Sequence, residues 1–168
     1  MSVSRKPKGY SDLIVAVWRD ETDRVDQLLQ KGADPNARDT DGRTPLMHAV
    51  LRNRLAILKL LSQRGAEVNL QDNGGFSALH FAAQNYELAA AEELLRAGAQ
   101  MELKDSFGNT PLWRAVTDSR GRGELITLLL RHGADRFAKN NSGKTPVDLA
   151  NVIANYDLKQ FFLEKSAE

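Results

Sequence analysis

The chain has 168 residues, with 23 basic and 22 acidic side chains, a formal net charge of +1 and no cysteine. A chain of this length can bury roughly 70% of its unfolded surface in one domain without disulfides or structural metals, and the lack of cysteine excludes disulfides, thiolate metal sites and cysteine nucleophiles. The balanced charge argues against nucleic acid as a partner. No apolar run approaches the roughly 20 residues of a membrane span, and the run from Leu13 to Trp18 is interrupted by charges too soon for a signal peptide. We therefore expect a cytoplasmic protein that binds neither nucleic acid nor membrane.

The N-terminal segment predicts a helical unit at residues 10–40, preceded by a flexible segment at 1–9. The second helix of this unit ends at Gly32-Ala33, and the unit has no Thr-Pro pair at its start. We expect its second helix to carry the charged residues Asp20, Glu21, Asp23, Arg24 and Asp26 on a side that faces water. We interpret this unit as an N-terminal cap with a solvated face.

Residues 41–73 predict a pair of helices. Thr44 can cap the first helix, and Pro45 suits its first position because the missing N–H costs nothing there. In the second helix, Ile57, Leu58, Leu60 and Leu61 form an apolar stripe that ends at Gly65, whose tolerance of positive φ suits a helix end. An extended segment then leads to a hairpin-like loop.

This unit is repeated along the chain. A glycine turn followed by a Pro-Leu-like pair recurs at 41–46, 74–79, 107–112 and 142–147, and Gly-Ala pairs at 32–33, 65–66, 98–99 and 133–134 are spaced by 33, 33 and 35 residues. The pattern predicts further units at 74–105, 106–140 and 141–163, the last being a C-terminal cap, with residues 164–168 flexible. A two-helix unit buries its apolar face only against its neighbours, so the sequence predicts an all-α solenoid of about five stacked units in a single domain, 1–168.

The unit at 106–140 is two residues longer than its neighbours. The excess lies between its helices, at 118–123. Insertions in solenoids often lie beside a binding surface, and slack loops of Gly and Ser also arise without a function. Both interpretations remain open.

The period and the motifs Thr44-Pro45-Leu46-Met47-x-Ala49 and Ser77-Ala78-Leu79-His80-x-Ala82 resemble the ankyrin-repeat family over residues 10–163. The resemblance implies a domain that binds other proteins. It also implies that His80 hydrogen-bonds the neighbouring turn; Trp113 occupies the same slot one unit later.

No catalytic constellation can be assembled from the sequence. The three histidines, His48, His80 and His132, lack the spacing of a zinc site, and His132 is placed to satisfy the last carbonyls of a helix. We expect no enzyme activity, no metal and no cofactor.

The resemblance implies that a partner binds a concave face built from the turn tips and the exposed ends of the first helices. We expect four side chains to expose apolar surface that folding does not explain: Trp18, Leu51, Phe76 and Phe107. For Trp18 the alternative is that it covers the open end of the core. Tyr86 is open to either interpretation. The expected binding residues are Trp18, Arg19, Arg43, Leu51, Arg52, Phe76, Gln84, Asn85, Phe107, Asn109, Asp118, Arg120 and Arg122.

The sequence therefore predicts a protein that binds another protein and blocks it. Before binding, we expect the protein to be a monomer. Some small ankyrin-like proteins of bacteria resemble immunity partners of toxins, which makes a toxin or an enzyme a candidate partner. A regulatory adaptor that leaves its partner active is the alternative, and a homo-oligomer ranks third. The sequence does not identify the partner.

Overall fold

The computed structural model describes residues 9–153 and 156–162. The helices are α1 (Asp12–Trp18), α2 (Thr22–Gln30), α3 (Pro45–Leu51), α4 (Leu55–Gln63), α5 (Ala78–Asn85), α6 (Leu88–Arg96), α7 (Pro111–Asp118), α8 (Glu124–Arg131), α9 (Pro146–Val152) and the short 3₁₀ helix η1 (Leu158–Phe161). The structure does not describe residues 1–8 and 164–168, which we expect to be flexible, or residue 163, where we expect the last unit to end. Within the described residues, no helix is both long and apolar enough to cross a membrane.

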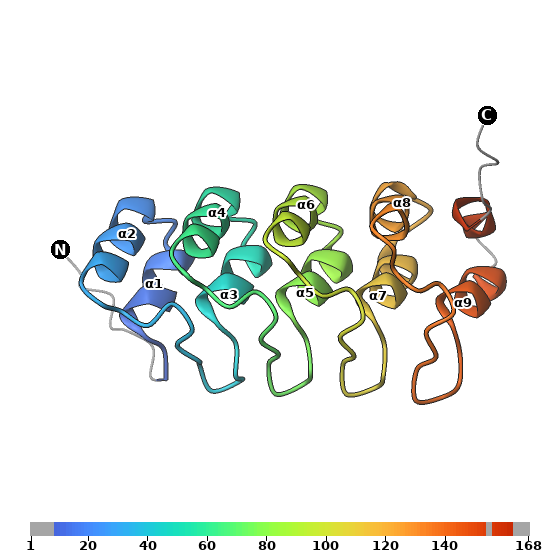
Figure 1. The fold of residues 1–168 in the computed structure, drawn as a ribbon, viewed down its shortest axis with the longest axis horizontal. Helices are drawn as coiled ribbons and strands as arrows, with labels where there is room; N and C mark the ends of the chain where they lie inside the picture. Colours follow the sequence, from blue (N-terminus) through green and yellow to red (C-terminus); the bar gives the residue numbers. More distant parts are fainter. Residues whose placement is uncertain (1–8, 154–155, 163–168) are drawn as a thin grey trace.

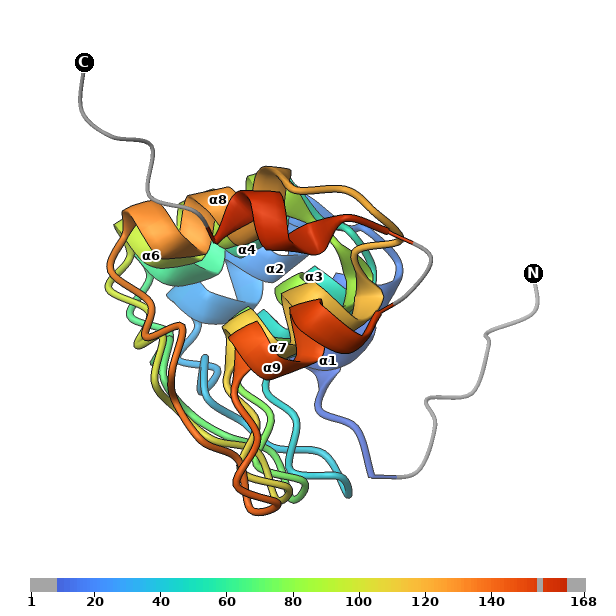
Figure 2. The same cartoon turned by 90° about the vertical axis from the view of Figure 1, so that its right-hand side faces the viewer.

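The helices form two parallel rows (Figure 1). We call α1, α3, α5, α7 and α9 the inner helices and α2, α4, α6 and α8 the outer helices; η1 follows α9 and packs on it. Each inner helix contacts the next inner helix, and each outer helix contacts the next outer helix. Long loops connect the units and extend away from the outer helices (Figure 2). The predicted all-α solenoid of stacked helix pairs is confirmed.

Side-chain caps start every inner helix. The hydroxyls of Ser11, Thr44, Ser77, Thr110 and Thr145 accept hydrogen bonds from backbone N–H groups of the first turn. The helices α3, α7 and α9 also carry proline at the first position, as the sequence predicts. These caps satisfy N–H groups that have no partner within the helix, and they fix where each loop joins its helix.

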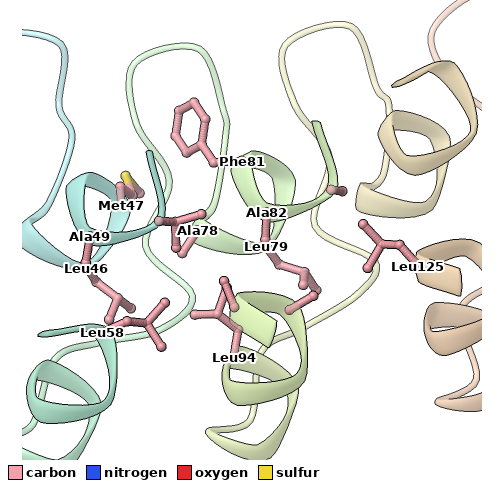
Figure 3. Packing of buried hydrophobic residues seen from close by; sticks show 14 of the residues in the cluster. Leu46, Met47, Ala49, Leu58, Ala78, Leu79, Phe81, Ala82, Leu94 and Leu125 are labelled. Carbon is pink, nitrogen blue, oxygen red and sulfur yellow. The ribbon is translucent and has the colours of Figure 1, made fainter. Parts of the chain in front are cut away.

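The core lies between the two rows of helices. Ile57, Leu58 and Leu61 of the predicted stripe are buried, and Leu60 is half-buried. In Figure 3 the leucines of the inner and outer helices point toward one another, whereas Phe81 points toward the loops. The buried cluster thus extends from the space between the rows to the side of the inner helices that faces the loops.

Tight turns join the two helices of each unit. Within two residues of the end of the inner helix, each turn has a residue with a positive φ, a conformation that favours glycine: Asp20 (60°), Asn53 (52°) and Tyr86 (58°). In the longer unit the corresponding residue is Arg120, with φ 51°. The residues with a positive φ lie at equivalent or nearly equivalent positions of the four turns. The insertion therefore lengthens the turn but keeps a residue of this conformation near the end of the inner helix.

The insertion contacts the C-terminal end of the stack. Gly121 lies against Tyr156, where an added Cβ would be 2.6 Å from Cδ1 of the ring, and Gly123 lies directly under the ring of Phe161. Neither glycine can carry a side chain without moving these aromatic rings. The loop at 118–123 therefore packs against Tyr156 and Phe161. This packing explains why the loop contains Gly121 and Gly123 without requiring a binding role for them.

Candidate functional site

Each loop is closed by one acidic or amide side chain that the sequence analysis did not single out. Asp39, Asp72, Asp105 and Asn140 occupy equivalent positions, and the Oδ1 atom of each accepts two backbone N–H groups from its own loop at 2.9–3.0 Å. Two such bonds fix the turn as a rigid unit. The spacing of these residues, 33, 33 and 35, equals that of the Gly-Ala pairs, and this shared spacing is the signal that could have identified them.

Backbone hydrogen bonds join neighbouring loops. The N–H of Asn73 donates to the carbonyl of Asp41 at 2.9 Å, that of Ser106 to Gly74 at 2.9 Å, and that of Asn141 to Phe107 at 3.0 Å. The loop tips therefore form a continuous row with fixed spacing. A partner that contacts several tips meets a surface that is already ordered.

In two of these loops the second carboxylate oxygen contacts a side chain of the inner helix. His48 lies 2.8 Å from Oδ2 of Asp39, and Nε of Arg114 lies 3.0 Å from Oδ2 of Asp105. Phe81 occupies the equivalent helical position in the unit between them and offers no polar group. There Arg43 of the preceding loop approaches Asp72 instead, at 3.5 Å.

Two arginines flank a pair of packed aromatic rings on this surface. The guanidinium of Arg43 lies 5.4 Å from the centre of the Phe81 ring, and Phe81 packs on Phe76 at 5.2 Å. The guanidinium of Arg114 lies 4.6 Å from the centre of the Phe76 ring. Such contacts stabilise an arginine in one orientation. An open depression next to this series is lined by Asp41, Arg43, Asp72, Asn73, Gly74, Phe76, Phe81 and Gln84.

A second aromatic group surrounds Trp18. The ring of Tyr10 lies 4.3 Å from the indole, and the guanidinium of Arg52 lies 5.3 Å from it on the exposed surface. The indole Nε1–H donates to Nδ1 of His48 at 3.0 Å. Trp18 is half-buried, so part of its ring remains accessible to solvent.

The structure places most of the expected binding residues on the accessible side of the loops and inner helices. Arg19, Arg52, Gln84, Asn85, Phe107, Arg120 and Arg122 are exposed, and Trp18, Arg43, Leu51, Phe76 and Asp118 are half-buried. Phe107 is 65% exposed at its loop tip. We call the exposed and half-buried members of this set, together with Tyr10 and Arg114, the recognition surface.

Two of the expected binding residues are less exposed than a free loop tip would be. Asn109 is only 7% exposed, because its side chain donates to Asp105 at 3.4 Å and accepts from Asn140 at 3.0 Å, joining two loops. Phe76 is half-buried because its ring contacts both Phe81 and Arg114. Asn109 therefore belongs to the support of the loops and not to the recognition surface.

The two buried histidines are neutral hydrogen-bonding residues. Nδ1 of His80 accepts from the Ser77 backbone at 3.1 Å, and its Nε2 donates to the carbonyl of Asn109 at 3.0 Å, the link to the next turn that the resemblance implies. Burial lowers the pKa of His80. Burial also lowers the pKa of His48, and this effect is larger than the opposite effect of Asp39. His132 is different: it is exposed, and its Nδ1 lies 2.9 Å from the carbonyl of Leu128 near the end of α8, as predicted.

For Asp39 and Asp105, burial raises the pKa of the carboxylate, but hydrogen bonds outweigh this effect. The N–H of Arg43 and the ring of His48 bring the pKa of Asp39 below its ordinary value. Arg114 and the N–H of Asn109 do the same for the pKa of Asp105. Both carboxylates are therefore ionised at neutral pH and serve as fixed acceptors.

Tyr86 has a structural role. Its hydroxyl accepts from the N–H of Leu125 and donates to Glu124, both at 3.3 Å, at the N-terminus of α8, where no side-chain cap is present. The guanidinium of Arg122 lies 3.8 Å from the centre of the Tyr86 ring. This contact connects one end of the recognition surface to the turn between α5 and α6.

A family model described as ankyrin repeats (3 copies) matches residues 13–105 and 79–168. The chain belongs to the ankyrin-repeat family. A search of curated proteins gives no match to the sequence. Ankyrin repeats are protein–protein interaction modules that generally carry no enzymatic activity, and they typically bind other proteins.

Proposed function

We propose that this protein binds a partner protein through the recognition surface and blocks the activity of that partner. The observation that carries the proposal is the exposed Phe107, which stands at the tip of the loop whose Asp105 binds Arg114. Folding gives no reason to expose a phenylalanine at a loop tip, and large exposed apolar groups on a polar surface indicate contacts with other proteins.

The surface has the chemistry of an interaction hot spot. Tryptophan, tyrosine and arginine carry much of the binding energy at protein interfaces, and Trp18, Tyr10 and Arg52 lie together here. Because the rings already hold the arginines in place, binding costs less side-chain entropy.

Arg52 is a candidate contact for a carboxylate of the partner. Its guanidinium stacks on Trp18 and pairs with no carboxylate within residues 9–153 and 156–162. Arg43 and Arg114, in contrast, are engaged by Asp72 and Asp105. Of these three arginines, Arg52 keeps its hydrogen-bond donors available for a partner.

The row of tips and inner helices favours a blocking role because it presents a long, rigid surface that can cover a standard interface of roughly 800 Å² per partner. A toxin or an enzyme neutralised by this protein is the partner class we propose. The alternative is an adaptor whose partner remains active in the complex.

The first test compares capture of partners from cells of the source organism by wild-type protein and by the variant Phe107→Ala. Loss of a contact of this kind costs about 2 kcal/mol, or roughly thirtyfold in Kd. The matched control is Phe137→Ala, because Phe137 is 64% exposed but lies on the segment after α8 and not at a loop tip.

The captured protein is identified by mass spectrometry and its affinity is measured with purified components. Equal weakening by both variants, or by neither, would contradict the proposed surface. The activity of the purified partner is then measured with and without this protein. Inhibition supports the blocking role, and unchanged turnover favours the adaptor.

A further inference from the structure

The indole of Trp18 is connected to a buried carboxylate through one histidine. Its Nε1–H lies 3.0 Å from Nδ1 of His48, and Nε2 of His48 lies 2.8 Å from Oδ2 of Asp39. His48 is 4% exposed, and the side chain of Asp39 is 1% exposed. The three side chains therefore form one hydrogen-bonded series that runs from a loop turn to the recognition surface.

The direction of these hydrogen bonds is fixed by chemistry. The indole nitrogen can only donate, so Nδ1 of His48 must accept and carries no proton. The proton of the neutral ring is then on Nε2 and is donated to Asp39. Oδ1 of Asp39 already accepts the N–H groups of Asp41 and Arg43, both at 2.9 Å, so the carboxylate is held in place.

We propose that Asp39 and His48 are positioning residues that hold the indole of Trp18 at the recognition surface, and that protonation of His48 releases the indole. A protonated imidazole donates from both nitrogens, so Nδ1–H would face the indole N–H and the hydrogen bond would be lost. The part of this inference that concerns binding rests on the proposed function, in which Trp18 contacts the partner.

The groups around His48 set the pH at which this occurs. The loop before α3 contributes Asp39 and Arg43, α3 contributes Arg52, and Tyr10 lies before α1 with its ring 6.2 Å from the imidazole. The ionisable side chain of α5, His80, is hydrogen-bonded to Ser77 and Asn109 instead.

Burial of His48 lowers its pKa, Asp39 counteracts this in part, and the charges of Arg43 and Arg52 lower the pKa further. The net pKa lies below the ordinary value of about 6.5. The release of Trp18 is therefore expected in mildly acidic solution and not at neutral pH.

Nuclear magnetic resonance of the full ¹⁵N-labelled chain tests the positioning pair without a partner. Long-range ¹H–¹⁵N spectra report the tautomer of His48, and the variant Trp113→Phe identifies the indole signal of Trp18. At pH 7.5 we expect His48 to be protonated on Nε2 alone. On acidification the indole signal should shift with the same midpoint as the His48 ring. A proton on Nδ1 at neutral pH, or an indole signal that does not follow His48, would overturn the proposal.

The variant Asp39→Asn gives a sharper test. Asn140 shows that an asparagine closes an equivalent loop with the same two backbone contacts, so the fold should tolerate the change. The amide nitrogen introduced at position 39 would donate to Nε2 of His48 and move the ring proton to Nδ1. The Trp18 indole should then give its acid-form signal already at pH 7.5.

Two further variants complete this test. The matched control is Asp105→Asn, the same substitution at a loop whose partner is Arg114, and it should leave the Trp18 signal unchanged. His48→Gln keeps an acceptor and a donor but does not titrate, so the pH-dependent shift should disappear while the folded spectrum is retained. A shift that persists in His48→Gln would show that another group is responsible.

Binding measurements separate this proposal from the proposed function. With the purified partner, affinity should fall below the His48 midpoint for the wild type and not for His48→Gln. If Trp18→Ala leaves binding unchanged, Trp18 is not part of the interface, even where the spectra show the positioning pair. If the indole signal does not follow the titration of His48, the proposed positioning role of Asp39 and His48 is wrong, whatever the binding data show.

Discussion

Phe161 in η1 lies directly over Gly123 at the N-terminus of α8, in the space that a Cβ atom on residue 123 would occupy. This contact ties the extended loop of the longer unit to the C-terminal end of the stack. Because φ of Gly123 is −111°, the glycine is required there for space and not for its backbone conformation.

The substitution Gly123→Ala should therefore act through this contact alone. We expect a loss of about 1–3 kcal/mol, the usual cost of overpacking, and faster amide hydrogen exchange in α9 and η1 than in α3. In a Phe161→Ala background the same substitution should be nearly neutral, since the obstructing ring is gone. Additive effects of the two substitutions would show that the ring does not occupy this position in solution.

The ion pair between Arg114 and Asp105 should contribute measurably to stability. The carboxylate is fully buried, so Arg114→Ala leaves Oδ2 of Asp105 without its charged partner, at a cost of about 2 kcal/mol. Urea denaturation followed by circular dichroism measures this change. The control Arg24→Ala removes an exposed arginine on α2 and should stay within about 0.5 kcal/mol of the wild type. Similar stabilities for the two variants would contradict the role of the pair.

The hydroxyl of Tyr86 should act as the cap of α8. Tyr86→Phe keeps the ring under Arg122 but removes the acceptor for the N–H of Leu125, and we expect a loss of about 1 kcal/mol. The exchange rate of the Leu125 amide should increase in the same variant. Tyr10→Phe is the comparison, because Tyr10 contacts Trp18 with its ring; it should leave both values unchanged. An unaltered Leu125 amide in Tyr86→Phe would rule out the cap.

Stability should decrease as the pH falls below about 6.5. The pKa values of His48 and His80 are lowered in the folded protein, so the unfolded chain binds protons more readily between the folded pKa and 6.5, and protons favour unfolding. The lowered pKa values of Asp39 and Asp105 add a second loss below about 4. Thermal melts between pH 8 and pH 3 measure both. A Tm that rises between pH 7 and pH 5.5 would contradict this assignment.

The candidate site was predictable only in part. Counting along the repeat placed Arg52, Gln84 and Phe107 correctly on the exposed side, because repetition fixes which positions face solvent. Asn109 occupies a tip position too, yet its amide joins two loops and is buried. Sequence position gives the face of a residue, but the partner of its side chain depends on residues about 31 positions away.

The sequence by itself determined the repeat, the helix caps and the family, since each depends on local spacing: a hydroxyl before Pro45, a glycine after the outer helix, an apolar stripe at helical intervals. Only the tertiary structure decided that Asp39 orients Trp18 through His48, that Arg43 replaces a missing helical partner for Asp72, and that Phe161 lies on Gly123. These contacts form when neighbouring units stack, and side-chain geometry across that junction is not encoded in any single repeat.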